Sequence, residues 1–219
     1  MQGGDMTPSA EQKQVLTVAD VEAADLPDWR WLLGALRAQF ATDDFVTGLA
    51  LVNAIGNLAE EADHHPDLEL EYAHVRVTLV SHDVSGVTSR DLDLARRISD
   101  TARGLDVAGE PSRLSVLEIG LDTADEAQIR PFWRAVLGLE GSSDEELPML
   151  WFQQTDPHRE PRQRFHLDVT VPPEVAPRRI AAALAAGGSL VSDRDAPAFT
   201  VLADVEGNRA CVCTAWGRD

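Results

Sequence analysis

Apolar and polar residues follow clear periods along the first half of the chain. Two short segments, 29–33 and 35–40, flank Gly34 and predict a hairpin of two strands. Beyond them, apolar residues recur at spacings of three and four, which predicts a helix capped by Thr42 and ending near Ala62. The buried face of this helix is expected to contain Phe45, Leu49, Val52, Ile55 and Ala59.

The pattern changes from helical spacing to alternation after Pro66, a residue that cannot continue the helix. Residues 68–71 alternate as a half-buried strand. A second strand starts a few residues later, and its polar face leads to His82 at the far end. The apolar face of this second strand contains Val75, Val77 and Leu79.

A last helix of this half begins where Thr88 and Asp91 have capping-box spacing, with Asp in place of the usual Glu, and it runs to Gly104. The expected order is α-β-β-α-β-β-α. This order predicts the α+β class, with one antiparallel sheet and its helices on one face.

The second half of the chain predicts a βαβββ unit that occurs twice. Its expected strands are 114–121, 149–153, 165–171, 200–203 and 210–214, and its expected helices are 124–137 and 177–186. The segment 106–113 is small, polar and bears Pro and Gly, which favours a linker. We therefore expect two domains, 14–105 and 114–217.

Composition narrows the possible partners. The chain has 219 residues with 19 Lys and Arg against 37 Asp and Glu, a formal charge of −18. This balance argues against binding to nucleic acid or to anionic membranes. Neither a signal-peptide pattern nor a membrane-length apolar stretch is present in the sequence, and Cys211 and Cys213 form no disulfide framework. We expect a cytoplasmic protein.

Histidines cluster in a way that composition does not explain. Four of the six lie between His64 and His82. His64 and His65 end the long helix, His82 ends a strand, and the two ends can meet over a sheet edge. Imidazole, with an ordinary pKa of about 6.5, serves as acid or base near neutrality. From spacing alone, a zinc site and ordinary surface histidines remain alternatives, although no Cys or Glu stands at the usual ligand spacing.

The same stretch resembles the signature of the pterin-4a-carbinolamine dehydratases. The matching residues run from Glu60 through His64-His65-Pro66 to Tyr72, then Ser81-His82-Asp83, Gly86, Thr88 and Asp91. Ser81 stands where the family has Thr, and the resemblance covers about residues 15–103.

This resemblance implies dehydration of 4a-hydroxytetrahydropterin, such as 4a-hydroxytetrahydrobiopterin, to quinonoid dihydropterin, with no metal and no cofactor. It implies that His64 and His82 are the acid/base pair and that His65 completes the site and helps to hold the pterin. Pro66, Glu60 and Asp91 are expected beside the substrate, with Asp91 also orienting an imidazole. The resemblance further implies a homo-oligomer.

The second half resembles a glyoxalase-like domain of the vicinal-oxygen-chelate superfamily, over about residues 114–216. Its first module is carried by 121–125, Phe132-Trp133 and 137–139, and its second module by 165–168 and 204–208. Enzymes of this superfamily bind a metal through His and Glu. Here His166 matches one ligand position, while Cys211 replaces a Glu, and Val205 replaces the usual Pro.

One remaining ligand does not hold a divalent ion well, so we expect no metal and a ligand-binding or assembly role for the second domain. Candidate residues for an apolar pocket are Trp133, Trp151 and Trp216. Two alternative functions remain open. In the first, the protein is catalytically silent and binds a pterin or a partner, or dimerises. In the second, the second domain carries the activity and acts on a small molecule.

Overall fold

A computed structural model of the chain describes residues 9–127, 149–156, 165–203 and 209–217. The chain divides into two compact units, Met1–Leu114 and Ser115–Asp219, and each is described by itself. Among the described residues, no helix combines the length and the apolar character needed to cross a bilayer.

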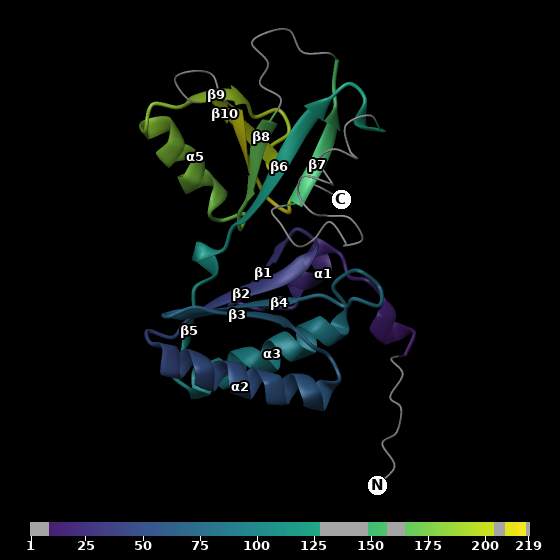
Figure 1. The fold of residues 1–219 in the computed structure, drawn as a ribbon, viewed down its shortest axis with the longest axis vertical. Helices are drawn as coiled ribbons and strands as arrows, with labels where there is room; N and C mark the ends of the chain where they lie inside the picture. Colours follow the sequence, from purple (N-terminus) through teal and green to yellow (C-terminus); the bar gives the residue numbers. More distant parts are fainter. Residues whose placement is uncertain (1–8, 128–148, 157–164, 204–208, 218–219) are drawn as a thin grey trace. The chain divides into compact units, whose positions relative to one another are not determined.

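The first unit is an antiparallel sheet with two long helices on one face (Figure 1). Its strands, in spatial order, are β1 (Trp29–Leu32), β2 (Ala35–Ala41), β4 (His74–Leu79) and β3 (Asp67–Leu70). The helices are α1 (Val18–Ala23), α2 (Phe45–Ala62) and α3 (Ser89–Gly104), after a short 3-10 turn at Glu11–Lys13. Helices α2 and α3 cover the sheet, which confirms the predicted α+β arrangement.

Several elements predicted from local sequence signals are present in the structure. Leu32 pairs with Ala35, so the hairpin turn contains only Leu33 and Gly34, both with positive φ (50° and 72°). This backbone geometry suits two-residue hairpin turns, and it explains the glycine. The capping box of α3 is present at its predicted residues. The apolar face of β4 is buried against α2 and α3, within a core that includes Phe40, Leu51, Ile55, Val75, Val77, Leu79 and Ile98.

Helix α2 departs from prediction at its start. It is capped by Asp44, whose side chain accepts a hydrogen bond from the Thr47 N–H at 2.7 Å, and not by Thr42. Thr42 is instead buried next to the sheet. Asp and Thr both serve as N-caps, so spacing alone did not distinguish them.

The buried face of α2 also differs from the predicted one. Ile55 and Ala59 are buried, and Val52 is partly so, but Phe45 and Leu49 are 47% and 44% exposed. The buried residues of this helix are Gly48, Leu51, Ile55 and Ala59. Two apolar stripes run along the first turns of α2, and packing on the sheet selects one of them.

The segment 106–113, predicted as a linker, takes part in the first sheet. Its residues Ala108–Gly109 form β5, which pairs antiparallel with β2, and Val107 is buried. A 3-10 turn follows at Pro111–Arg113.

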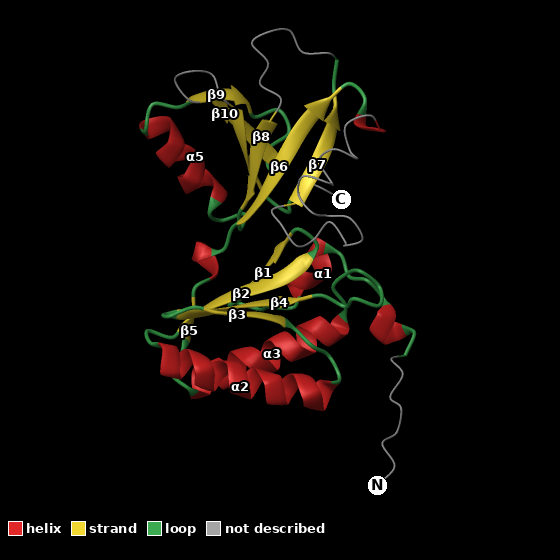
Figure 2. Ribbon diagram, in the orientation of Figure 1, coloured by secondary structure: helices red, strands yellow, loops and turns green. Residues whose placement is uncertain are grey.

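The second unit is a six-stranded mixed sheet flanked by α5 (Ala176–Ala185) (Figure 2). In spatial order its strands are β7 (Met149–Gln154), β6 (Val116–Thr123), β8 (Phe165–Thr170), β11 (Arg209–Cys213), β10 (Phe199–Ala203) and β9 (Ser189–Ser192). Strands β6 and β8 pair antiparallel, while β7 pairs parallel to β6 and β11 parallel to β8.

One complete βαβββ module, β8-α5-β9-β10-β11, lies within the described residues. Its short strand β9 was not assigned from the sequence, because two serines frame only two apolar residues. Most of the helix predicted at 124–137 lies outside the described residues, as do Trp133 and the stretch 204–208.

Candidate active site

The end of α2 directs His64 into the interior of the first unit. Asp63 adopts a left-handed backbone (φ 47°), and the His64 N–H donates to the Ala59 carbonyl at 3.1 Å. These are the hydrogen bonds of a Schellman-type helix end, after which Pro66 prevents the helix from continuing. His64 is only 7% exposed, so its position is defined by the protein rather than by water.

His64 and Asp91 form a buried pair. Nε2 of His64 lies 2.7 Å from Oδ1 of Asp91, which is fully buried in the first turn of α3. The other carboxylate oxygen, Oδ2, accepts hydrogen bonds from the Ser81 hydroxyl and from the Thr88 backbone N–H, both at 2.7 Å. One carboxylate therefore caps α3 and contacts the imidazole at the same time.

The hydrogen bonds to Asp91 decide its charge. Burial acts to raise the pKa of this carboxyl, but hydrogen bonds from His64, Ser81 and Thr88 together outweigh burial and hold the pKa below its ordinary value of 3.8. An ionised carboxylate only accepts hydrogen bonds, so Nε2 of His64 is the donor of this pair. Nδ1 is then the ring nitrogen that remains for proton transfer.

His82 lies in a turn and not on strand β4, which ends before it. The turn is closed by a bridge between Ser81 and Gly86, and the His82 side chain is exposed. Strand parity therefore does not set its direction. The hydroxyl of the preceding residue, Ser81, binds the same carboxylate that binds His64, so the turn carrying His82 is attached to the His64–Asp91 pair.

His65 and Glu60 lie on the solvent side of the helix end. Nε2 of His65 is 3.2 Å from Oε1 of Glu60, and both side chains are well exposed. Exposed pairs of this kind contribute little to stability, so the core does not depend on either side chain. Of the predicted site residues, the structure joins His64 and Asp91 directly. No hydrogen bond within the described ranges links His65 or His82 to that pair.

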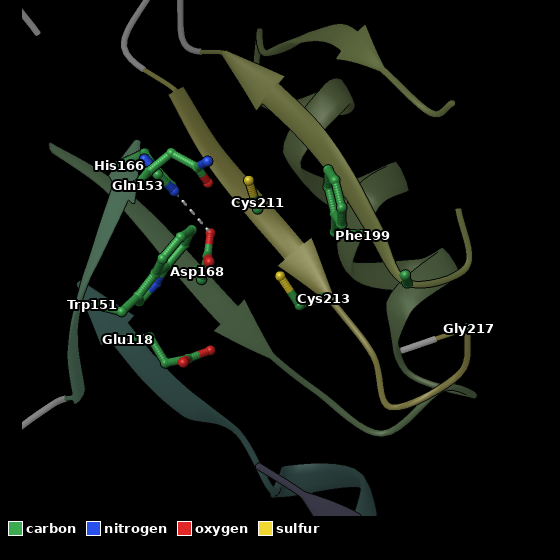
Figure 3. Close-up of a pocket in the computed structure, with 10 residues that line it drawn as sticks. Glu118, Trp151, Gln153, His166, Asp168, Phe199, Cys211, Cys213 and Gly217 are labelled. Carbon is green, nitrogen blue, oxygen red and sulfur yellow. Dashed lines mark ion pairs between the residues drawn. The ribbon is translucent and has the colours of Figure 1, made fainter. Parts of the chain in front are cut away.

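A second candidate site is a cavity of about 420 Å³ in the second unit (Figure 3). Its polar lining comes from neighbouring strands, with Glu118 on β6, His166 and Asp168 on β8, and Cys211 and Cys213 on β11. Trp151 also lines the cavity, as predicted, and its ring meets the His166 ring edge-on at 5.4 Å. Trp216 is 46% exposed and is not among the lining residues.

Sequence reasoning missed two contributors to these sites. Ser81 stood out only as a departure from a motif, although its hydroxyl binds Asp91. Asp168 stood out only as part of a motif, yet a ligand atom from each of His166, Asp168 and Cys211 lies within 4.8 Å of the others. The available signal was the i, i+2 spacing of His166 and Asp168, which places both side chains on one face of a strand.

Known proteins match the chain in two separate segments. Residues 10–101 match the family described as Pterin 4 alpha carbinolamine dehydratase, and residues 118–213 match the one described as Glyoxalase-like domain. Both matches agree with the resemblances identified from the residues themselves.

Individual relatives match the first segment. A protein of Thermosynechococcus vestitus named "Putative pterin-4-alpha-carbinolamine dehydratase" is 44% identical over 89 residues, which is 40% of this chain and 94% of that protein. A similarly named protein of Gloeobacter violaceus is 41% identical over 86 residues, 36% of this chain and 94% of its own length. The crystal structure of a transcriptional coactivator/pterin dehydratase from Brucella melitensis is 31% identical, with a TM-score of 0.39, and covers 41% of this chain and 99% of its own.

Proposed function

Because this chain belongs to the pterin-4a-carbinolamine dehydratase family through its first unit, we propose that this unit dehydrates 4a-hydroxytetrahydropterin to quinonoid dihydropterin. The observation that carries the proposal is the buried His64–Asp91 pair, with Nε2 of the imidazole 2.7 Å from the carboxylate. An imidazole oriented by an ionised carboxylate is equipped to exchange a proton through its second nitrogen.

The reaction needs two proton transfers and no change of oxidation state. One group protonates the 4a-hydroxyl, which leaves as water, and another removes the proton from N5 as the C4a=N5 double bond forms. We assign the two groups to His64 and His82. One proton is donated and one is removed, so the reaction changes no net proton count. Two imidazoles that are restored afterwards by proton exchange with water can therefore complete the cycle without a metal or cofactor.

The helix end and the turn give the two histidines different settings. His64 is buried and attached to Asp91, while His82 is exposed on the turn that Ser81 attaches to the same carboxylate. The pH dependence of the rate in each single variant would assign the acid and the base. His65, with Glu60 and Pro66, completes the proposed site on its solvent side and would contact the pterin.

The proposal is tested by turnover of chemically generated 4a-carbinolamine by the full-length chain. We expect His64→Ala and His82→Ala each to lower kcat by roughly 10²-fold, within the usual range for loss of a general acid or base. His74→Ala is the matched control: His74 begins β4, pairs with Glu71 at 2.7 Å, and has no role in the proposal. Unchanged rates in both His64→Ala and His82→Ala would refute this mechanism.

The alternative of a silent binding protein is separated by combining the turnover assay with a thermal-shift measurement with pterins. A catalytically silent pterin-binding protein would be stabilised by pterins and would not turn over the carbinolamine. The predicted homo-oligomer is a separate proposal, which sedimentation of the full-length chain would check.

A further inference from the structure

We infer that the second unit binds a divalent transition-metal ion of the zinc class through His166, Asp168 and Cys211. This inference concerns a site that the proposed dehydratase activity does not use. It replaces the expectation that His166 stands alone, because the sheet adds two ligands that spacing along the chain did not reveal.

Strand register brings the three side chains together. His166 and Asp168 are two apart on β8 and share a face, and Cys211 pairs directly with Asp168 across the parallel β8–β11 ladder. Figure 3 shows the imidazole, the carboxylate and the thiol around the same cavity. One ligand atom from each lies within 4.8 Å of the other two, a spacing that a single ion can bridge with small side-chain adjustments.

Asp168 has a buried carboxylate oxygen that makes no hydrogen bond to the described residues. The residue is 5% exposed, and the oxygen is Oδ1. Nε2 of His166 lies 3.6 Å from this oxygen, beyond hydrogen-bond range. Two ligands of a tetrahedral ion with bonds of about 2.0–2.2 Å stand roughly 3.3–3.6 Å apart, so this separation suits a metal better than a direct hydrogen bond.

A second buried carboxylate strengthens the case for a cation. Glu118 on β6 pairs directly with Asp168 across the antiparallel ladder, and it is 6% exposed. Like charges directly opposite each other on neighbouring strands destabilise a sheet, and burial increases their repulsion. A divalent ion at Asp168 would offset that repulsion.

His166 has a second carboxylate near its other ring nitrogen. Its Nδ1 lies 3.4 Å from a carboxylate oxygen of Asp122, which leaves Nε2 directed toward Asp168. Histidine ligands commonly have a carboxylate at the second nitrogen, which orients the ring. Gly120 makes room for the ring, since a Cβ at that position would lie 2.5 Å from Nε2.

The donor set indicates the class of ion. Imidazole, thiolate and carboxylate together suit zinc and its neighbours, whereas magnesium and calcium prefer oxygen ligands alone. With three protein ligands, a four-coordinate ion would keep one position open. Such an open position is the arrangement of zinc sites that accept water or a small molecule.

The test uses the full-length chain without a histidine tag, stripped with a chelator and titrated with Co²⁺ and then Zn²⁺. We expect about one equivalent of Co²⁺ per chain, with the ligand-to-metal absorption band of a cobalt–thiolate bond, and displacement of that band by Zn²⁺. Cys211→Ser should abolish the band and weaken binding at least about 100-fold, more than is usual for loss of an outer-shell partner. Asp168→Asn should also weaken binding.

Cys213→Ser is the matched control, because Cys213 lines the same cavity from the same strand but lies outside the three-residue group. It should keep both the band and the stoichiometry. The inference is overturned if the wild-type chain gives no thiolate band, or if the band survives Cys211→Ser. Should Asp168→Asn fail to fold by circular dichroism, His166→Gln provides the second ligand variant, and unchanged Co²⁺ binding there would equally overturn the site.

Discussion

Nε2 of His64 and Oδ1 of Asp91 lie 2.7 Å apart inside the first unit, although 27 positions separate the two residues in the chain. The same carboxylate closes the N-terminal cap of α3 through Thr88. The pair thus joins the end of α2 to the start of α3, and we expect it to support both stability and proton transfer.

Replacing the Asp91 carboxylate by an amide tests its positioning role. Asp91→Asn keeps the size but replaces one acceptor oxygen by an NH₂ donor, so it cannot accept hydrogen bonds from His64, Ser81 and Thr88 together. We expect kcat to fall on the order of 10²-fold, with a smaller change in KM and a shifted pH–rate profile.

A matched control for this substitution lies in the same helix. Asp93→Asn changes an exposed aspartate of α3 whose partner is Arg96, and it should leave the rate and the pH profile unchanged. A rate for Asp91→Asn within about twofold of wild type would contradict the positioning role, because loss of a general acid or base costs far more.

Stability should depend on pH through Asp91. The pKa of this carboxyl is lower in the folded protein than its ordinary value of 3.8, so ionised Asp91 stabilises the fold above that value. This contribution is lost as pH falls through 3.8 toward the lower folded pKa. The difference in free energy of unfolding between wild type and Asp91→Asn should therefore narrow as pH falls from about 5 toward and below 3.8.

Urea unfolding of the two proteins across this pH range measures the effect. Asp20, Asp44 and Asp83 also have lowered pKa values from hydrogen bonds to Thr17, Thr47 and Arg90, but they are present in both proteins and cancel in the difference. A difference that grows on acidification would show that the sign is wrong.

Two glycines of α2 should respond in opposite directions to alanine. At Gly56 an added Cβ meets nothing within 4 Å, so Gly56→Ala should stabilise the protein by about 0.5–1 kcal/mol through reduced backbone freedom of the unfolded chain. At Gly48 the Cβ would lie 2.6 Å from Cδ1 of Leu70, so Gly48→Ala should destabilise by about 1–3 kcal/mol.

Urea unfolding at neutral pH checks this pair, and each variant serves as the control for the other. Equal effects at the two positions would mean that the packing of α2 on β3 is not as described.

Gly120 should be required for the proposed metal site. A Cβ there would lie 2.5 Å from Nε2 of His166, so Gly120→Ala should displace the ring from Asp168 and Cys211. We expect Zn²⁺ to raise the thermal midpoint of the wild-type chain and to leave that of Gly120→Ala nearly unchanged, since a ligand stabilises only the state that binds it. An equal shift in both proteins would contradict the arrangement around His166.

The sequence by itself determined the elements whose signals are local. The hairpin at Gly34, the capping box at Thr88 and Asp91 and the buried face of β4 each depend on residues a few positions apart, so periodicity and cap chemistry are sufficient to predict them. The histidine cluster, interpreted as a family motif, also indicated which helix end carries the candidate site, although it placed His82 at the end of a strand and the structure places it in a turn.

Tertiary structure decided which partners those elements meet. The choice of buried stripe on α2, the contact of His64 with Asp91 and the alignment of Asp168 with Cys211 all depend on packing and strand register between distant segments. No local spacing encodes these relations, because a helix with two apolar stripes can bury either one, and the elements that it packs against select which. A strand's register exists only once its neighbour is in place.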